Sequence, residues 1–404
     1  MKNVIKTLLT IALIFTFSQN IFAYTDVTVE DGYDYTKFKD SNIELNIYNW
    51  GLNLANGEDD ILDVNEAFTN LTGIKINYNT YETNEMMYSK IKSGGGNYDL
   101  IFPSDYMIAR MIHENLLSPL NFDNIPNYKY IGEDYKNQPF DPKNQYSVPY
   151  MWGLVGICYN KTMVDEKDLE EGFNILFNPK YKGQILMVNN SRDAFGITSK
   201  ALGMPINQTT MEEIEIIEEK LKEQTPLVQM YVMDEIFDKM EGEEAALGTY
   251  YIGDGLLMKE VNPNIEMYVP KDGTNFYVDS MCIPKDAQNK EAAEMYINFL
   301  NETEVALENC LYTSYSTPHT QAMQMLSDEL KNSPLLYPSK EIMEKTEAFI
   351  MLDDDINKAM DEAWSQIRAS EENNNIVIIS LLVIILGVVI FLIIRIRKNK
   401  KIDY

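Results

Sequence analysis

The stretch YDLIFPSDY, residues 98–106, decides the fold class of this chain. Its apolar run Leu100–Phe102 is too short for a buried helix and fits an inner strand of a parallel sheet. Pro103 ends the strand, and Ser104 or Asp105 can cap the helix that follows. In open α/β sheets, small ligands bind where strands end in this way. Taken alone, however, the stretch is more simply explained as a plain strand-to-helix turn with no ligand.

The segments on both sides extend this pattern. Residues 43–48 and 74–78 alternate apolar and polar side chains, and helical spacing separates them. The resulting order β-α-β-α-β-α predicts a parallel sheet with helices on both faces. Trp50 and Ser104 are then expected at the same edge of that sheet. We expect residues 24–41 to form a loose polar leader, and a strand at 245–251 to end at the glycines of 253–255, where either a helix or a turn can follow.

Composition limits the possible functions. The 404 residues, 45% of them hydrophobic, are enough for two domains with sizeable cores. The net charge of −28 argues against nucleic acid as a partner and favours a cationic ligand, although solubility alone also explains the acidity. Cys158, Cys282 and Cys310 have no metal-binding spacing, so we expect buried thiols and neither a metal nor a cofactor.

Both ends of the chain carry targeting features. Residues 1–23 have two lysines, an apolar core and a terminal alanine, which predicts a secretory signal peptide. The uncharged stretch 376–394 is long enough, at about 1.5 Å per residue, to form a transmembrane helix. The tail 395–404 is basic, and by the positive-inside rule it is cytoplasmic. We therefore expect a single-pass protein of the cell membrane whose large domain lies on the periplasmic or extracellular side.

Five corners of the chain, where strands end, combine aromatic, hydroxyl and acidic residues. Aromatic rings can contact methylene groups and attract a cation, while carboxylates accept hydrogen bonds from an ammonium group. This combination suits an alkyl ammonium ligand, although each residue alone is more simply a core tyrosine or a helix cap. The corners are Trp50; Ser104 with Tyr106; Asn190 with Asp193; Tyr251 with Asp254; and Tyr277 with Asp279.

Five motifs together resemble the spermidine/putrescine-binding proteins of ABC importers. They are IYNW (47–50), YNTYETNEMMY (78–88), YDLIFPSDY (98–106), YSVPYMWG (146–153) and YVDS (277–280). The resemblance covers roughly residues 42–370 and implies an α/β, two-lobed clamshell of the type II periplasmic-binding-protein kind. Residues 42–157 with about 280–325 are expected in lobe 1, and 158–279 with about 326–370 in lobe 2. A polyamine is expected in the cleft between the lobes, and ABC permease subunits are the expected partners of a monomer.

The resemblance also implies roles for nine residues. They are aromatic walls at Trp50, Tyr251 and Tyr277; a polar floor at Ser104 and Tyr106; ligand carboxylates at Asp193 and Asp279; a putrescine-type acid at Asp254; and a further ring at Tyr315. Asn190 stands where spermidine-type members often have aspartate, and the segment after Trp50 lacks an acid and a tyrosine that can occur there. These departures leave putrescine and spermidine open. The C-terminal transmembrane helix departs from the soluble or lipid-anchored pattern of the family.

Three alternatives remain open at this stage. A binding protein for an amino acid or another small cation would use Arg192 to hold a ligand carboxylate. A hydrolase would use two acids such as Asp193 and Asp279, but no nucleophile motif, metal spacing or cofactor loop supports an enzyme. A signalling or adhesion ectodomain would bind the same ligand without transport. We therefore expect a binding protein that is not an enzyme.

Overall fold

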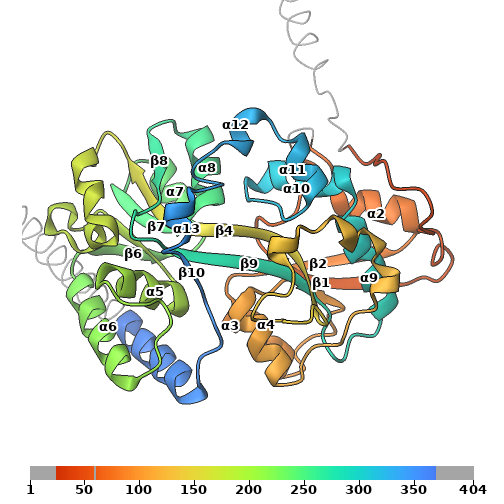
Figure 1. The fold of residues 1–404 in the computed structure, drawn as a ribbon, viewed down its shortest axis with the longest axis horizontal. Coiled ribbons are helices and arrows are strands. Elements are labelled where there is room, and N and C mark those ends of the chain that lie inside the picture. The colour runs from red at the N-terminus through yellow and green to blue at the C-terminus, as the bar shows by residue number, and fades with distance from the viewer. Residues whose placement is uncertain (1–23, 59–60, 370–404) are drawn as a thin grey trace, which may run out of the picture. The chain divides into compact units, whose positions relative to one another are not determined.

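The computed structural model describes residues 24–58 and 61–369 (Figure 1). The predicted signal peptide (1–23), transmembrane helix (376–394) and basic tail (395–404) lie outside these residues. Within the described part, no helix is long and apolar enough to cross a membrane. The described chain forms two discontinuous units, one of 24–152 with Val278–Leu336 and one of Gly153–Tyr277 with 337–369. Asp279 therefore falls in the first unit, although the expected boundary had put it in the second lobe.

The first unit is built on parallel strands. Strand β1 (Glu44–Trp50) pairs in parallel with β2 (Lys75–Tyr81) and with β3 (Leu100–Ile101). The register places Trp50 opposite Tyr81, so these strand ends meet at one edge, as the sequence predicts. Strand β9 (Asn275–Cys282) joins β3 in antiparallel orientation through Cys282.

Helices cover this sheet and end where the sequence dictates. Helix α2 starts at an Asp63 cap and stops at Gly73, whose left-handed φ of 78° suits glycine. Both α2 and α3 contact β2 (Figure 1). A buried aromatic cluster of Phe68, Tyr296 and Phe299 joins α2 to α9. The helices of this unit are α2 (Val64–Thr72), α3 (Asn84–Lys92), α4 (Asp105–His113), α9 (Lys290–Leu300), α10 (Thr303–Thr313), α11 (Thr320–Met325) and α12 (Asp328–Lys331), with short 3-10 turns at Phe122–Asn124, Pro126–Tyr130 and Glu133–Tyr135.

The N-terminal segment is not the loose leader that its polarity predicts. The buried Glu302 carboxylate accepts hydrogen bonds from the Glu30 amide at 2.9 Å and from the Tyr35 hydroxyl at 2.5 Å. Glu304 likewise accepts from the Thr28 amide at 2.9 Å and from the Tyr24 hydroxyl. Two glutamates at the start of α10 thus hold the segment in place, and local sequence gives no sign of such distant partners.

The second unit contains a mixed sheet. Strand β4 (Ser147–Asn160), which like β9 runs through both units, pairs antiparallel with β7 and β8, while β5 pairs in parallel with β6 and β7. The other strands are β5 (Ile185–Val188), β6 (Val228–Val232), β7 (Leu247–Tyr251), β8 (Ile265–Tyr268) and β10 (Glu347–Ala348). The helices are α5 (Ser191–Ala201), α6 (Met211–Gln224), α7 (Glu235–Glu241), α8 (Ile252–Val261) and α13 (Lys340–Met343), a helix over 354–369, and 3-10 turns at Glu166–Phe177 and Pro179–Tyr181.

A helix and not a turn follows β7. The sequence leaves both possible after the strand, and α8 begins at Ile252 and runs through both glycines around Asp254. A Cβ at position 255 would lie 2.0 Å from the Met267 sulfur, so glycine lets α8 pack tightly on β8. Tertiary packing here overrides the low helix propensity of glycine. The three cysteines are free and buried, as predicted.

Candidate functional site: two acidic and aromatic clusters

The first cluster forms where β3 ends. Ser104 occupies the N-cap position of α4, but its side chain does not cap the helix. Its hydroxyl instead donates to the Asp279 carboxylate at 2.6 Å. The Asp105 carboxylate accepts a hydrogen bond from the Tyr106 amide at 2.6 Å, so Asp105 and not Ser104 binds a backbone N–H at the start of α4. An isolated β-bridge between Ser104 and Asp279 fixes this pairing, which joins two of the predicted ligand residues.

Asn84 and Glu85 complete this cluster, and sequence reasoning missed both. The Asn84 amide nitrogen lies 3.1 Å from the Ser104 hydroxyl and 3.2 Å from the Tyr106 hydroxyl. The Tyr106 hydroxyl donates to Glu85 at 2.8 Å. Both residues belong to the first turn of α3, where asparagine and glutamate are common for helix-start reasons alone. The only available signal was their place inside the family motif at 78–88.

Trp50 lies beside this cluster with its polar end fixed. Its indole N–H donates to the Phe102 carbonyl at 2.8 Å, and the Tyr81 hydroxyl donates to the same oxygen at 2.7 Å. The two rings contact at 4.6 Å between centroids. Burial, together with the negative charge of Asp279, raises the pKa of Tyr81 well above its usual range, so Tyr81 remains a neutral donor. The expected position of Trp50 at this sheet edge is confirmed.

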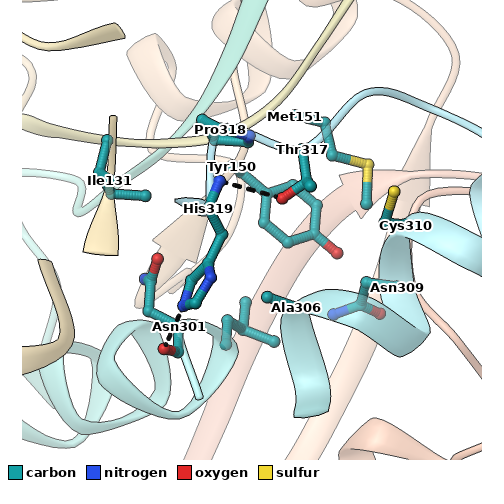
Figure 2. A pocket seen from close by; sticks show the side chains of 11 residues that line it. Ile131, Tyr150, Met151, Asn301, Ala306, Asn309, Cys310, Thr317, Pro318 and His319 are labelled. Atoms are coloured by element: carbon teal, nitrogen blue, oxygen red, sulfur yellow. Dashed lines mark hydrogen bonds between the residues drawn. The ribbon is translucent and has the colours of Figure 1, made fainter. Parts of the chain in front are cut away.

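Tyr315 follows α10 and packs on the core of the same unit. Its carbonyl accepts from the Cys310 thiol at 3.1 Å, and Cys310 lines a small cavity with Asn309 and His319 (Figure 2). None of the nine predicted residues lines this cavity. Its volume of about 10 Å³ holds roughly one water molecule and is too small for an alkyl diamine.

The second cluster connects a helix start with two aromatic rings. Asp193 lies in the first turn of α5, where the helix dipole favours a carboxylate. The Tyr251 hydroxyl donates to Asp193 at 2.8 Å, and its ring meets the Tyr277 ring edge to face at 5.3 Å. Burial raises the pKa of Tyr251 well above its usual range, and the charge of Asp193 adds to this. Tyr251 therefore stays protonated and donates to the acid.

Asp254 belongs to the same part of the second unit. It lies in the first turn of α8, directly after Tyr251, and is 7% exposed. Burial is the main reason that the pKa of Tyr250 lies well above its usual range, and the negative charge of Asp254 is the next. The structure thus places Asp193, Tyr251, Tyr277 and Asp254 on neighbouring elements of one unit.

The neighbours of Asp193 have structural roles. Asn190 caps α5, because its side-chain oxygen accepts from the amides of Arg192 at 2.9 Å and Asp193 at 3.2 Å. The Arg192 guanidinium is 2% exposed, donates to the Ile350 carbonyl at 2.9 Å and stacks on the Phe349 ring. These contacts dock the returning C-terminal segment, so the amino-acid alternative, which needs Arg192 for a ligand carboxylate, is not favoured.

Comparison with known proteins agrees with this arrangement. Residues 97–346 match the family described as bacterial extracellular solute-binding protein. The spermidine/putrescine-binding periplasmic protein of Escherichia coli is 35% identical over 309 residues, which cover 76% of this chain and 87% of that protein. The chain belongs to the spermidine/putrescine-binding proteins. The corresponding protein of Salmonella typhimurium is also 35% identical, over 76% of this chain and 86% of its own length.

Solved structures of spermidine/putrescine-binding proteins share this fold. A putative spermidine/putrescine ABC transporter protein from Listeria monocytogenes superposes with a TM-score of 0.76 at 35% identity, covering 80% of this chain and 98% of that one. A spermidine/putrescine substrate-binding protein from Streptococcus pneumoniae gives a TM-score of 0.68 at 35% identity, covering 82% and 100%. The α/β periplasmic-binding-protein fold expected from the motifs is confirmed.

Proposed function

We propose that this protein is an extracytoplasmic receptor that binds a polyamine, putrescine or spermidine, and delivers it to the permease of an ABC importer. The observation that carries the proposal is the pairing of carboxylate and hydroxyl in both units, Asp279 with Ser104 and Asp193 with Tyr251. A chain of this family with such pairs beside aromatic rings is suited to a ligand with an ammonium group at each end.

The chemistry of each pair fits an ammonium group. An ammonium has three donors and no acceptor, so it matches a carboxylate whose other hydrogen bond comes from a neutral hydroxyl. The rings of Tyr251 and Tyr277 add a surface for methylene groups and for the cation itself. We expect Asp279 and Asp193 each to be able to bind an amine of a polyamine.

The family and the same residues support transport in preference to enzymatic turnover. A binding protein must release its ligand unchanged, and neither cluster contains an activated nucleophile. Tyr251 donates its hydrogen to Asp193 and is held neutral by burial, which makes it a poor nucleophile. Recovery of the ligand unchanged after denaturation of the complex is the expected result, and a cleaved or modified ligand would exclude transport as the sole role.

Membrane attachment is the second part of the proposal. The uncharged stretch 376–394 and the basic residues after it form the anchor, and the signal peptide exports the remainder. Protease added to intact spheroplasts should therefore digest the binding domain and spare the tail. Protection of the domain would contradict this topology. A monomer is expected, because the anchor needs no second copy.

Calorimetry of the full-length protein in detergent tests the ligand class. The ligands are putrescine, spermidine, spermine and arginine, and the expected order places a polyamine well ahead of arginine. Arginine carries a carboxylate that would face Asp279 or Asp193, and like charges in a partly buried site are costly. Preference for arginine, or no binding of any polyamine, would contradict the proposal.

A further inference from the structure

The orientation of the Asn84 side chain is fixed by a backbone group. Asn84 is 2% exposed, and its side-chain oxygen lies 3.1 Å from the Ser104 backbone nitrogen, which donates to it. A backbone N–H can only donate, so the oxygen and not the nitrogen of the amide must occupy this position. The oxygen and the nitrogen of an amide have nearly the same shape, and the Ser104 N–H donor therefore decides which of the two lies at this position.

The amide nitrogen of Asn84 then faces two hydroxyl groups. It lies 3.1 Å from the Ser104 oxygen and 3.2 Å from the Tyr106 oxygen. An amide NH₂ group has two hydrogens and no lone pair for hydrogen bonding, so both hydroxyl oxygens must accept from it. Each hydroxyl must therefore send its own hydrogen elsewhere.

Both hydroxyl hydrogens go to carboxylates. The Ser104 hydroxyl donates to Asp279 at 2.6 Å, and the Tyr106 hydroxyl donates to Glu85 at 2.8 Å. We propose that Asn84 is a positioning residue that commits the Ser104 and Tyr106 hydroxyl hydrogens to carboxylates, so that the first cluster recognises ligands only as an acceptor. This inference rests on the proposed function, because it explains why that cluster selects an ammonium group.

The consequence is selectivity by hydrogen-bond direction. A ligand ammonium, which only donates, meets two carboxylates and two oxygens that present lone pairs. A ligand carboxylate in the same place, which only accepts, receives no hydrogen from Ser104 or Tyr106 and is repelled by the acids. If Asn84 were absent, the Ser104 and Tyr106 hydroxyls could rotate and donate to such a ligand. Asn84 is then needed for discrimination even though the amide need not touch the ligand.

The test compares two ligands that differ at one end. Wild type, Asn84→Ala and the control Asn77→Ala are titrated by calorimetry, as full-length protein in detergent, with putrescine and with 4-aminobutanoate, whose carboxylate end only accepts hydrogen bonds. Asn77 is an exposed asparagine on β2 of the same unit, whose amide bonds Asn46. We expect the ratio of the two affinities to fall about tenfold in Asn84→Ala, the effect of one hydrogen bond to a charged group, and to stay unchanged in Asn77→Ala.

The outcomes separate this inference from the function on which it rests. If wild type binds no polyamine, the proposed function fails. If wild type binds putrescine but Asn84→Ala weakens both ligands equally, Asn84 is merely structural and the inference is wrong. Should Asn84→Ala not fold, neutron diffraction from crystals of the deuterated wild type locates the same hydrogens directly. Deuterons between Ser104 and Asp279 and between Tyr106 and Glu85 are expected, and any other placement overturns the inference.

Discussion

The two clusters present carboxylates by different structural means. In the first unit, Asp279 is joined to Ser104, which is 175 residues away in sequence, and the network around them consists of an amide, hydroxyls and acids. In the second unit, Asp193 sits on a helix N-terminus and connects through Tyr251 to the Tyr277 ring. The first cluster controls hydrogen-bond direction, and the second provides aromatic surface.

This difference predicts how strongly ligand binding in each unit depends on a single polar residue. A network of directed hydrogen bonds fails as a whole when one acceptor becomes a donor, because its neighbours cannot all reorient. An aromatic surface retains contact area and cation–π attraction when one polar partner changes. We therefore expect substitutions of acids to cost more binding energy in the first unit than in the second.

Asp279→Asn is expected to have the largest effect. It removes a charge and turns an amide toward Ser104 and the ligand ammonium, so binding should weaken by about 2–5 kcal/mol. This corresponds to roughly 30-fold to several thousandfold in affinity for putrescine or spermidine. Calorimetry measures the loss, and circular dichroism checks the fold. The control Asp354→Asn changes an exposed acid and should do almost nothing. An affinity within about threefold of wild type would show that Asp279 is not a ligand residue.

Asp193→Asn should cost less, near 2–3 kcal/mol, the lower part of the range for a lost charge partner. The Tyr251 and Tyr277 rings keep their mutual contact in this variant and, in the proposed site, their aromatic surface for the ligand, which is the reason for the smaller loss. Measured side by side with Asp279→Asn, it tests the comparison itself. A larger loss for Asp193→Asn than for Asp279→Asn would reverse the proposed roles of the two clusters.

Asp254→Asn distinguishes the ligands by length. If Asp254 has the role that the resemblance implies, an acid of the putrescine type, putrescine should lose affinity by an amount similar to that of Asp193→Asn. Spermidine should then lose much less. Titration of the variant with both polyamines gives the answer as a ratio. Equal small losses for both ligands would remove Asp254 from the site.

Tyr251→Phe isolates the hydroxyl from the ring. The variant keeps the contact with Tyr277 but removes the donor to Asp193, so binding should weaken by about 1 kcal/mol, or about fivefold. Tyr250→Phe is the matched control, since its hydroxyl bonds Asp234 instead at 3.3 Å. If both variants lose affinity equally, the Tyr251–Asp193 hydrogen bond is not part of ligand binding.

Local patterns predicted the parts of the fold that local forces determine. The alternation of apolar and polar side chains at 43–48 predicted β1, and the same alternation at 74–78 predicted β2. Whether a helix or a turn follows Tyr251 was left open, because the close approach of α8 to Met267 decides that helix. Periodicity and caps report on neighbours in sequence, and such packing is invisible to them.

The candidate site was predictable only as a set of residue types. Aromatic and acidic corners and the family motifs pointed to Ser104, Tyr106 and Asp279, and Ser104 was expected to cap a helix. In the structure, the Ser104 hydroxyl instead donates to Asp279, a partner that cannot be predicted from the residues next to Ser104 in sequence. Asn84 and Glu85 looked like ordinary residues of a helix start. Their roles depend on which end of an amide faces a backbone N–H, and that requires three-dimensional structure.

The smallest predicted effect is a pH dependence of stability, and it is expected in the first unit alone. Both histidines of the sequence, His113 and His319, lie in that unit. The His319 ring caps α11, accepting from the Ala322 amide at 3.1 Å through Nδ1, while Nε2 donates to the Asn301 carbonyl at 3.1 Å (Figure 2). Both contacts together require a neutral ring. Burial lowers the pKa of His319 and outweighs the opposing effects of the hydrogen bond to the Asn301 carbonyl and, last, of the negative charge of Glu30.

A lowered pKa means that the folded protein binds fewer protons than the unfolded chain below about pH 6.5, the ordinary value for histidine. Stability from His319 is therefore fully present above that pH and is lost as the pH falls toward the folded pKa. We expect exchange of the Ala322 amide, corrected for its intrinsic pH dependence, to be faster at about pH 5.5 than at about pH 7.5. His319→Asn, which keeps a capping oxygen and cannot titrate here, should abolish the difference. Equal pH dependence of Ala322 amide exchange in wild type and variant would show that groups other than His319 cause it. A pH-dependent change in amide exchange in the second unit would show that the effect is not confined to the first unit.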